Sequence, residues 1–327
     1  MAAGWQLSEG RMSYKSASDD EYFAAVTKAL SNQSSKTTSY KFGFLRAILE
    51  NLYQNDAELK LNYSQLAHSM AKLYWNLVIE YEYQQGHRSQ IVSILTNFKN
   101  TYGIPSKVSY DVINPLTQAA LEKEITNKIL KKYVVGALFE DTNKILYSFS
   151  KKEGLIRFSD ASLHFLRKYQ TTIFKLTTYE LTKYIQIQNP LVDHQILIES
   201  IENITKRSSL LQFQKELIQL TGAKCFYTET HLHSSKRSIA VDHFIPWSFI
   251  HSDDLWNLVL TSQSLNSKKG SKLPDKNFLN KLHSRNVLLK QSEDIHVRLA
   301  FEGYHFQIVR DLYQYADVNG FEIGWKA

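Results

Sequence analysis

The sequence of 327 residues contains a single cysteine, Cys225. One cysteine excludes an intrachain disulfide framework, and it excludes a zinc site built from four cysteines of one chain. Glycine and proline are also scarce, with 12 and 5 residues, which favours helices because these residues most often interrupt them. No run reaches the roughly 18 apolar residues of a membrane helix, and the start lacks the apolar core of a signal peptide. We therefore expect no membrane association and a reducing, cytoplasmic setting.

The charge is moderately positive. Lysine and arginine number 39 against 32 acidic residues, a formal net charge of +7. This excess favours an acidic partner such as nucleic acid. Hydrophobic residues at 43% and charged residues at 22% are typical of a globular chain, so extensive disorder is not expected. At roughly 150 residues per domain, the length predicts two domains.

Apolar residues recur at helical spacing through most of the first two thirds of the chain. The predicted helices cover residues 37–53, 63–83, 88–98, 116–138, 161–188 and 195–220. Residues 145–159 alternate around Gly154 and predict a small β-hairpin. Gly222 follows the last predicted helix, where glycine suits a helix end. We therefore predict a mainly α region over residues 1–221 and a small α+β module over residues 222–327 that includes a C-terminal helical extension.

The chemistry is concentrated between residues 238 and 274. The texture there is a strand that ends at Asp242 and His243, an irregular loop, a short strand near Asn257, and a helix that contains Asn266. Neighbouring residues of a strand point to opposite sides, so Asp242 and His243 diverge. Carboxylate and amide oxygens from Asp242 and Asn266 would suit a hard ion such as Mg²⁺. His243 could then take a proton from a water molecule that attacks a phosphodiester.

Several charged residues flank these four positions. Lys268, Lys269 and Lys272 follow Asn266 at once and could attract the backbone of a nucleic acid, although a solvated helix face explains them equally well. Asp253 and Asp254 are expected to cap the second strand and face solvent, with a supplementary metal role as the alternative. The pair His231 and His233 is expected to lie on a surface loop.

This segment resembles the HNH endonuclease family, whose nuclease module has the ββα-metal fold. Asp242-His243 matches the first motif element, Asn257 the central asparagine and Asn266 the third position. Fifteen residues separate Asp242 from Asn257 and nine more lead to Asn266, a spacing similar to that of the HNH domain in RNA-guided Cas9 enzymes. The resemblance covers about 40–60 of the 327 residues.

The resemblance implies a role for each matching residue. Asp242 and Asn266 would hold Mg²⁺ or Mn²⁺, His243 would be the general base in DNA phosphodiester hydrolysis, and Asn257 would fix the loop that carries the histidine. Many family members also hold a structural zinc through cysteine pairs. Here the second position of the first pair is Thr228, so we expect no structural zinc. Apolar packing is expected to replace it, with four candidate residues: Phe226, Trp247, Trp256 and Leu273.

Two other interpretations remain open. The chain could be a non-catalytic DNA-binding or sensor protein on a degenerate nuclease fold, or a toxic effector nuclease that a regulatory protein partner holds in check. A homodimer would allow a single ββα site per chain to cut both strands. Ser39-Tyr40-Lys41 resembles a helix start in HNH proteins linked to restriction or phage defence, and a simple capped helix explains it as well.

Overall fold

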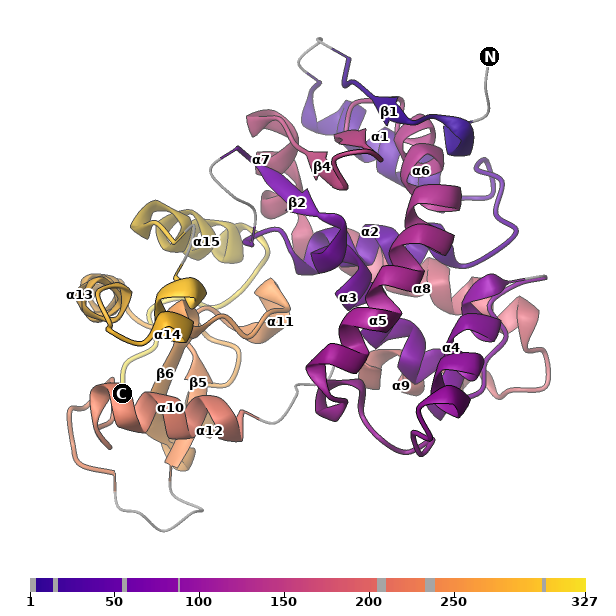
Figure 1. Cartoon of the computed structure of the whole chain (residues 1–327). Helices are drawn as coiled ribbons and strands as arrows, with labels where there is room; N and C mark the ends of the chain where they lie inside the picture. The colour runs from indigo at the N-terminus through magenta and orange to yellow at the C-terminus, as the bar shows by residue number, and fades with distance from the viewer. Residues whose placement is uncertain are drawn as a thin grey trace. The chain divides into compact units, whose positions relative to one another are not determined.

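The computed structural model describes residues 4–13, 17–54, 58–87, 89–204, 210–232, 239–301 and 304–327. It is mainly helical with small antiparallel sheets, as the sequence predicts. The chain divides into two compact units (Figure 1). The first comprises Met1–Leu166 and Thr172–Lys206, and the second comprises Arg167–Thr171 and Arg207–Ala327. No helix in the described part of the chain is both long and apolar enough to cross a membrane.

The first unit is built from nine α-helices among the residues described. They are α1 (Asp19–Leu30), α2 (Tyr40–Glu50), α3 (Tyr63–Tyr74), α4 (Gln90–Thr101), α5 (Pro115–Ile125), α6 (Val135–Asp141), α7 (Asp160–Lys168), α8 (Gln170–Gln188) and α9 (His194–Ile204), of which α7 and α8 each extend across a unit boundary. Two π-helical segments, η2 (Trp75–Glu80) and η4 (Thr126–Val134), continue α3 and α5. Two three-residue 3-10 turns are η1 (Gly4–Gln6) and η3 (Tyr110–Val112). The helical regions predicted up to residue 188 are confirmed, whereas the single helix predicted over residues 195–220 is wrong: α9 ends at Ile204, and a separate helix over Leu211–Thr221 belongs to the second unit. Helix α1 is an addition whose start is fixed by a capping box between Ser18 and Glu21.

Helix α2 forms the centre of this unit. Nearly all of its residues are buried, among them Phe42, Phe44, Leu45 and Ile48. A helix that is apolar on every side must be covered on every side, and α2 packs against α1, α3, α6 and η4. Gly43 permits the closest of these approaches, because a Cβ atom there would lie 2.6 Å from the hydroxyl oxygen of Tyr74.

A four-stranded sheet lies in the first unit, with the order β1-β3-β4-β2. The strands are β1 (Glu9–Gly10), β2 (Lys60–Asn62), β3 (Ser148–Ser150) and β4 (Leu155–Arg157), all paired antiparallel. Strands β3 and β4 form the predicted hairpin around Gly154, which has the positive φ of +71° that glycine adopts without strain. Strands β1 and β2 are too short to leave a periodic signal in the sequence.

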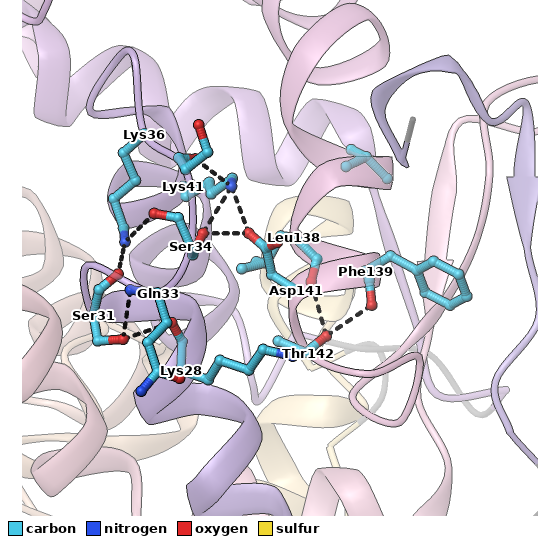
Figure 2. A network of polar contacts seen from close by, with 12 residues as sticks. Lys28, Ser31, Gln33, Ser34, Lys36, Lys41, Leu138, Phe139, Asp141 and Thr142 are labelled. Carbon is cyan, nitrogen blue, oxygen red and sulfur yellow. Dashed lines mark hydrogen bonds and ion pairs between the residues drawn. The ribbon is translucent and has the colours of Figure 1, made fainter. Parts of the chain in front are cut away.

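A polar network joins the segment before α2 to the end of α6 (Figure 2). The Lys41 ammonium lies 2.5 Å from the Asp141 carboxylate, and the Ser34 hydroxyl donates to the same carboxylate at 2.6 Å. Lys36 donates to the carbonyls of Ser31 and Ser34, and burial together with the charge of Lys41 lowers its pKa to about 8. The Lys41–Asp141 ion pair therefore links α2 to α6.

The other two residues of the Ser39-Tyr40-Lys41 motif are also structural. Ser39 is buried and donates to Gln85 Oε1 at 2.8 Å. The Tyr40 hydroxyl accepts from the backbone of Ile91 at 3.1 Å. The motif thus positions α2 against Gln85 and against Ile91 at the start of α4, and the Ser39 side chain makes no cap hydrogen bond.

The second unit contains a two-stranded antiparallel sheet of β5 (Ile239–His243) and β6 (Leu258–Ser262). Its helices are α10 (Leu211–Thr221), α11 (Trp247–Ile250), α12 (Gln263–Lys269), α13 (Asn277–Lys290), α14 (Ile295–Ala300) and α15 (Phe306–Val318), with a 3-10 turn η5 (Leu255–Asn257). Helices α10 and α12 contact both strands (Figure 1). Helix α10 therefore belongs with the second unit, although the sequence places the boundary after it, at Gly222.

Aromatic rings surround the segment where zinc cysteines occur in many HNH proteins. Tyr227 makes edge-to-face contacts with Phe226, Phe278 and Trp325, with ring centroids 4.9–5.2 Å apart. Cys225 is buried, and its sulfur lies 3.5 Å from the Thr261 hydroxyl. Of the four residues expected to stabilise this module, Trp256 and Leu273 are buried, whereas Phe226 and Trp247 are half-buried.

Candidate active site

The end of strand β5 delivers Asp242 and His243. In the antiparallel register Asp242 lies opposite Val259 and His243 opposite Leu258. Successive strand residues point to opposite faces, so the carboxylate and the imidazole reach different neighbours, as the sequence predicts. Both side chains are buried, with exposures of 4% and 1%.

Asn257 fixes the loop that follows His243. The Ile245 backbone N–H donates to Asn257 Oδ1 at 2.8 Å, and Asn257 Nδ2 donates to the Ile245 carbonyl at 2.9 Å. The Phe244 backbone N–H also donates to the Asn257 carbonyl at 2.8 Å. Asn257 is fully buried, so its amide replaces water as the partner of Ile245. These bonds hold the chain immediately after His243 against the start of β6.

His243 is paired with an acidic residue. Its Nε2 atom lies 2.7 Å from Asp253 Oδ1. A carboxylate on one ring nitrogen fixes the tautomer and orientation of an imidazole, because it selects the N–H form at that nitrogen. The sequence suggested that Asp253 faces solvent, and this was wrong. The side chain is 18% exposed and turned toward His243. Ten residues separate the two in an irregular loop, so no periodic signal could reveal the pair.

Asp254 also differs from its expected place at the surface. Its carboxylate accepts from the Ser252 hydroxyl at 2.6 Å, and its backbone carbonyl accepts from the Asn257 N–H at 2.8 Å. Burial raises the pKa of Asp254 from its ordinary value to about 6. Asp254 is half-buried and supports the loop through these two hydrogen bonds.

Asp242 is bound by two donors that the sequence did not assign to it. The Tyr227 hydroxyl donates to Oδ2 at 2.5 Å. The Lys269 ammonium lies 3.1 Å from each carboxylate oxygen and donates to the His243 carbonyl at 2.8 Å. Burial first, and the Asp242 charge second, raise the pKa of Tyr227 well above its usual range, so the phenol stays neutral. The sequence drew attention to this segment only through Thr228, which stands where many HNH proteins have a zinc-binding cysteine. The contact between Tyr227 and Asp242 is visible only in the tertiary structure.

Helix α12 carries the third motif position and the lysines. Ser262 caps it by accepting from the Leu265 N–H at 3.2 Å, and Gly270 ends it with a φ of +54°. Asn266 is half-buried on this helix. Because Asn266 and Lys269 are three residues apart, they lie on the same helix face. The contact of Lys269 with Asp242 shows that this face is turned toward Asp242.

The three lysines have different surroundings. Lys268 is exposed, as phosphate binding requires. Lys272 is paired with Glu322 at 2.9 Å, with 41% of its side chain exposed. Lys269 departs from the expectation of a surface lysine, because none of its side chain is exposed and its ammonium is bonded to Asp242. Its position three residues after Asn266 turns it inward, whereas Lys268 is turned outward.

Two residues of α13 support the start of β6. Arg285 donates to the carbonyls of Trp256 and Leu258, and Asn286 Nδ2 donates to the Trp256 carbonyl at 2.8 Å. Burial lowers the pKa of Arg285 to about 10, so it remains charged at neutral pH. The sequence did not point to either residue. His231, which the sequence placed on a surface loop, is exposed, and His233 lies outside the described residues.

Among the described residues no group of three or more His, Cys, Asp or Glu side chains is arranged to hold a metal ion. The candidate ligand pair of Asp242 and Asn266 contains only one such residue. Its fit can be judged from Lys269, whose ammonium is surrounded by two carboxylate oxygens and one carbonyl oxygen. An all-oxygen environment that already stabilises a cation suits a hard divalent ion. The residues present therefore fit a metal of this class.

Comparison with known families agrees with this geometry. Residues 225–275 match the family model described as HNH endonuclease. The matched segment contains Asp242, His243, Asn257 and Asn266, together with β5, β6 and α12. Curated proteins and solved structures give no significant match to the chain. The second unit thus contains a segment similar to the HNH endonuclease family, and this similarity suggests nuclease activity.

Proposed function

We propose that the chain is a metal-dependent endonuclease that hydrolyses DNA phosphodiester bonds at the site formed by β5, β6 and α12. The observation that carries the proposal is the arrangement around His243. The imidazole is paired with Asp253, follows Asp242 directly and precedes a loop that Asn257 fixes. Strand, strand and helix follow in the order of a ββα-metal module, and the HNH family match covers all three.

His243 acts as the general base in this proposal. With Nε2 donating to Asp253, the neutral imidazole has its basic lone pair on Nδ1, and the Asp253 charge stabilises the imidazolium that forms. The proton comes from the water whose oxygen attacks phosphorus while the bond to the leaving oxygen breaks. Asp253 is a positioning residue, since it acts through His243.

Asp242 and Asn266 would hold Mg²⁺ or Mn²⁺. When bound, the ion would stabilise the negative charge that develops on the phosphate. Asn266 supplies an amide oxygen, which favours these hard ions over softer ones. Lys268 is exposed and is proposed to contact the DNA backbone, with Lys272 nearby in sequence. Lys269 is excluded from this role as long as it remains bonded to Asp242.

Cleavage of supercoiled plasmid tests the proposal. The full chain with Mg²⁺ or Mn²⁺ should nick the plasmid, and chelation should stop the reaction. His243→Ala should lose this activity, with Lys41→Ala as a control in the other unit. Undiminished cutting by a folded His243→Ala variant would contradict the role of the base. Binding of DNA without metal, and no cleavage of any substrate, would favour the non-catalytic alternative.

A regulated nuclease is the second candidate, and one observation favours it. Asp242, His243 and Lys269 are all buried, so this arrangement does not present the catalytic groups to a DNA strand. A partner or ligand that opens the site would then control activity, in a setting such as bacterial restriction or phage defence. Growth arrest by the wild-type chain, but not by His243→Ala, only in cells challenged with phage would support this candidate. Equal cleavage by the purified chain with and without cell extract would argue against it.

A further inference from the structure

Lys269 occupies an unusual place for a lysine at the end of a surface helix. Its side chain is completely buried, and its ammonium is within 3.1 Å of both Asp242 carboxylate oxygens and within 2.8 Å of the His243 carbonyl. A buried charge is stable only when it is paired and hydrogen-bonded, and this ammonium meets both conditions. Asp242 therefore already has a cationic partner supplied by the chain itself.

Helix α12 carries both this cation and the proposed metal ligand Asn266. Asn266 lies one turn before Lys269 on the same face, and that face is directed at Asp242. An ion held by Asp242 and Asn266 would lie in or next to the volume that the ammonium fills. The divalent ion and the Lys269 ammonium would repel each other strongly there, because screening by water is weak in a buried site.

We infer that Lys269 competes with the divalent ion for Asp242, so that metal binds only as the Lys269 ammonium leaves the carboxylate. Lys269 thereby sets the metal affinity of the site. This inference rests on the proposed function, since it concerns the same metal site. It also accounts for the burial of Asp242, because the Lys269 ammonium covers the carboxylate until a divalent ion replaces it.

Removal of the competing charge should strengthen metal binding. Calorimetric titration of the full-length chain with Mn²⁺, at fixed pH and salt, is the measurement. We expect Lys269→Met to bind Mn²⁺ at least tenfold more tightly than the wild type, and methionine is long enough to fill the buried volume. Lys268→Met removes the same charge one residue away and should change the affinity less than twofold. Equal or weaker Mn²⁺ binding by a folded Lys269→Met chain would overturn the inference.

A second measurement uses the wild-type chain and does not depend on the folding of a variant. Acetylation of lysines followed by peptide mapping should show Lys269 protected relative to Lys268. Saturating Mn²⁺ should raise the modification of Lys269 severalfold while that of Lys268 stays constant. Unchanged protection of Lys269 at saturating Mn²⁺ would overturn the exchange.

The outcomes separate this inference from the proposed function. If neither the wild type nor Lys269→Met binds Mn²⁺, both are overturned. If the wild type binds Mn²⁺ through Asp242 but the Lys269→Met affinity is unchanged, only the competition is wrong. If the affinity rises as expected and no nucleic acid is cleaved, the inference stands and the endonuclease proposal fails.

Discussion

Two lysine–aspartate pairs, Lys41–Asp141 in the first unit and Lys269–Asp242 in the second, differ in their surroundings. Lys41 and Asp141 lie 2.5 Å apart with side-chain exposures of 14% and 24%, and serine groups complete their contacts. Lys269 and Asp242 lie 3.1 Å apart with exposures of 0% and 4%. The Lys41–Asp141 pair is therefore partly exposed to solvent, whereas the Lys269–Asp242 pair is buried.

The neighbours of the pairs differ in chemical capacity. Besides Asp141, Lys41 contacts a hydroxyl and a carbonyl group, which help to fix the position of α2 without offering a base (Figure 2). Beside Asp242 lie an imidazole with its own carboxylate partner and, on α12, an amide one turn from the lysine. An ion pair next to a titratable base can support a reaction, whereas one among hydroxyls mainly supports a fold.

The largest expected contrast is in catalysis. His243→Ala should lower plasmid cleavage by about 10²–10⁴-fold, the contribution typical of a general base. Lys41→Ala should leave the rate per folded molecule within about threefold, because a packing residue outside the site contributes to stability rather than to the chemistry. Initial rates of nicking with Mn²⁺, normalised to the folded fraction, measure both. Similar losses in the two variants would remove the distinction between the pairs.

The second contrast is in stability. Lys269→Met should lower the free energy of unfolding by about 3–5 kcal/mol, because it leaves the Asp242 charge buried without its partner. Lys41→Met should cost about 1 kcal/mol, since its pair is partly exposed and screened. Urea denaturation at pH 7 without divalent ions compares them. Equal costs would mean that burial does not separate the two pairs.

The third prediction concerns the loop after His243. Asn257→Ala should lower the unfolding free energy by about 3 kcal/mol, because the N–H and carbonyl of Ile245 would be buried without partners. Asn266→Ala, a matched change on the half-buried face of α12, should cost less than about 1 kcal/mol. Urea denaturation measures both, and a loss below 1 kcal/mol for Asn257→Ala would contradict its structural role.

A fourth prediction follows from Asp254. Its folded pKa of about 6 lies above its ordinary value of 3.8, so the folded state favours the protonated form. The resulting stabilisation is present below about pH 4 and is lost as the pH rises through 6. We expect this loss to reach about 2 kcal/mol by pH 7, after allowance for partial exposure.

Asp254→Asn keeps an acceptor for Ser252 and removes the titration. The unfolding free energy of this variant should therefore rise relative to the wild type between pH 4 and pH 7. Denaturation series at both pH values measure the difference. A constant difference would show that Asp254 ionises normally in the folded chain.

The smallest effect is expected for the exposed lysine of α12. Lys268→Ala should weaken DNA binding severalfold and reduce the slope of log affinity against log salt by about 1, as the loss of one phosphate contact requires. Lys123→Ala, a change of an exposed lysine in the first unit, is the control. An unchanged salt slope for Lys268→Ala would place the DNA elsewhere.

Much of the secondary structure could be predicted from local patterns. Most helices of the first unit, with α1 as an exception, and the hairpin at Gly154 follow from apolar periodicity and glycine chemistry. Strand β1 could not be predicted, because two residues carry no period and its partner β3 lies about 140 residues later. Asp253 and Tyr227 could not be assigned to the site from the sequence either, because they lie in a loop and a turn, which have no periodic pattern.

The sequence by itself determined the order of the chemical groups. The spacing of Asp242, His243, Asn257 and Asn266 indicated an HNH endonuclease segment, and the family match over residues 225–275 agrees with it. Tertiary structure alone decided which side chains touch these groups. Adjacent lysines on α12 have opposite positions, one in solvent and one against Asp242, because a helix turns by about 100° per residue. Composition cannot separate them, since a side chain's neighbours depend on segments far away in the chain.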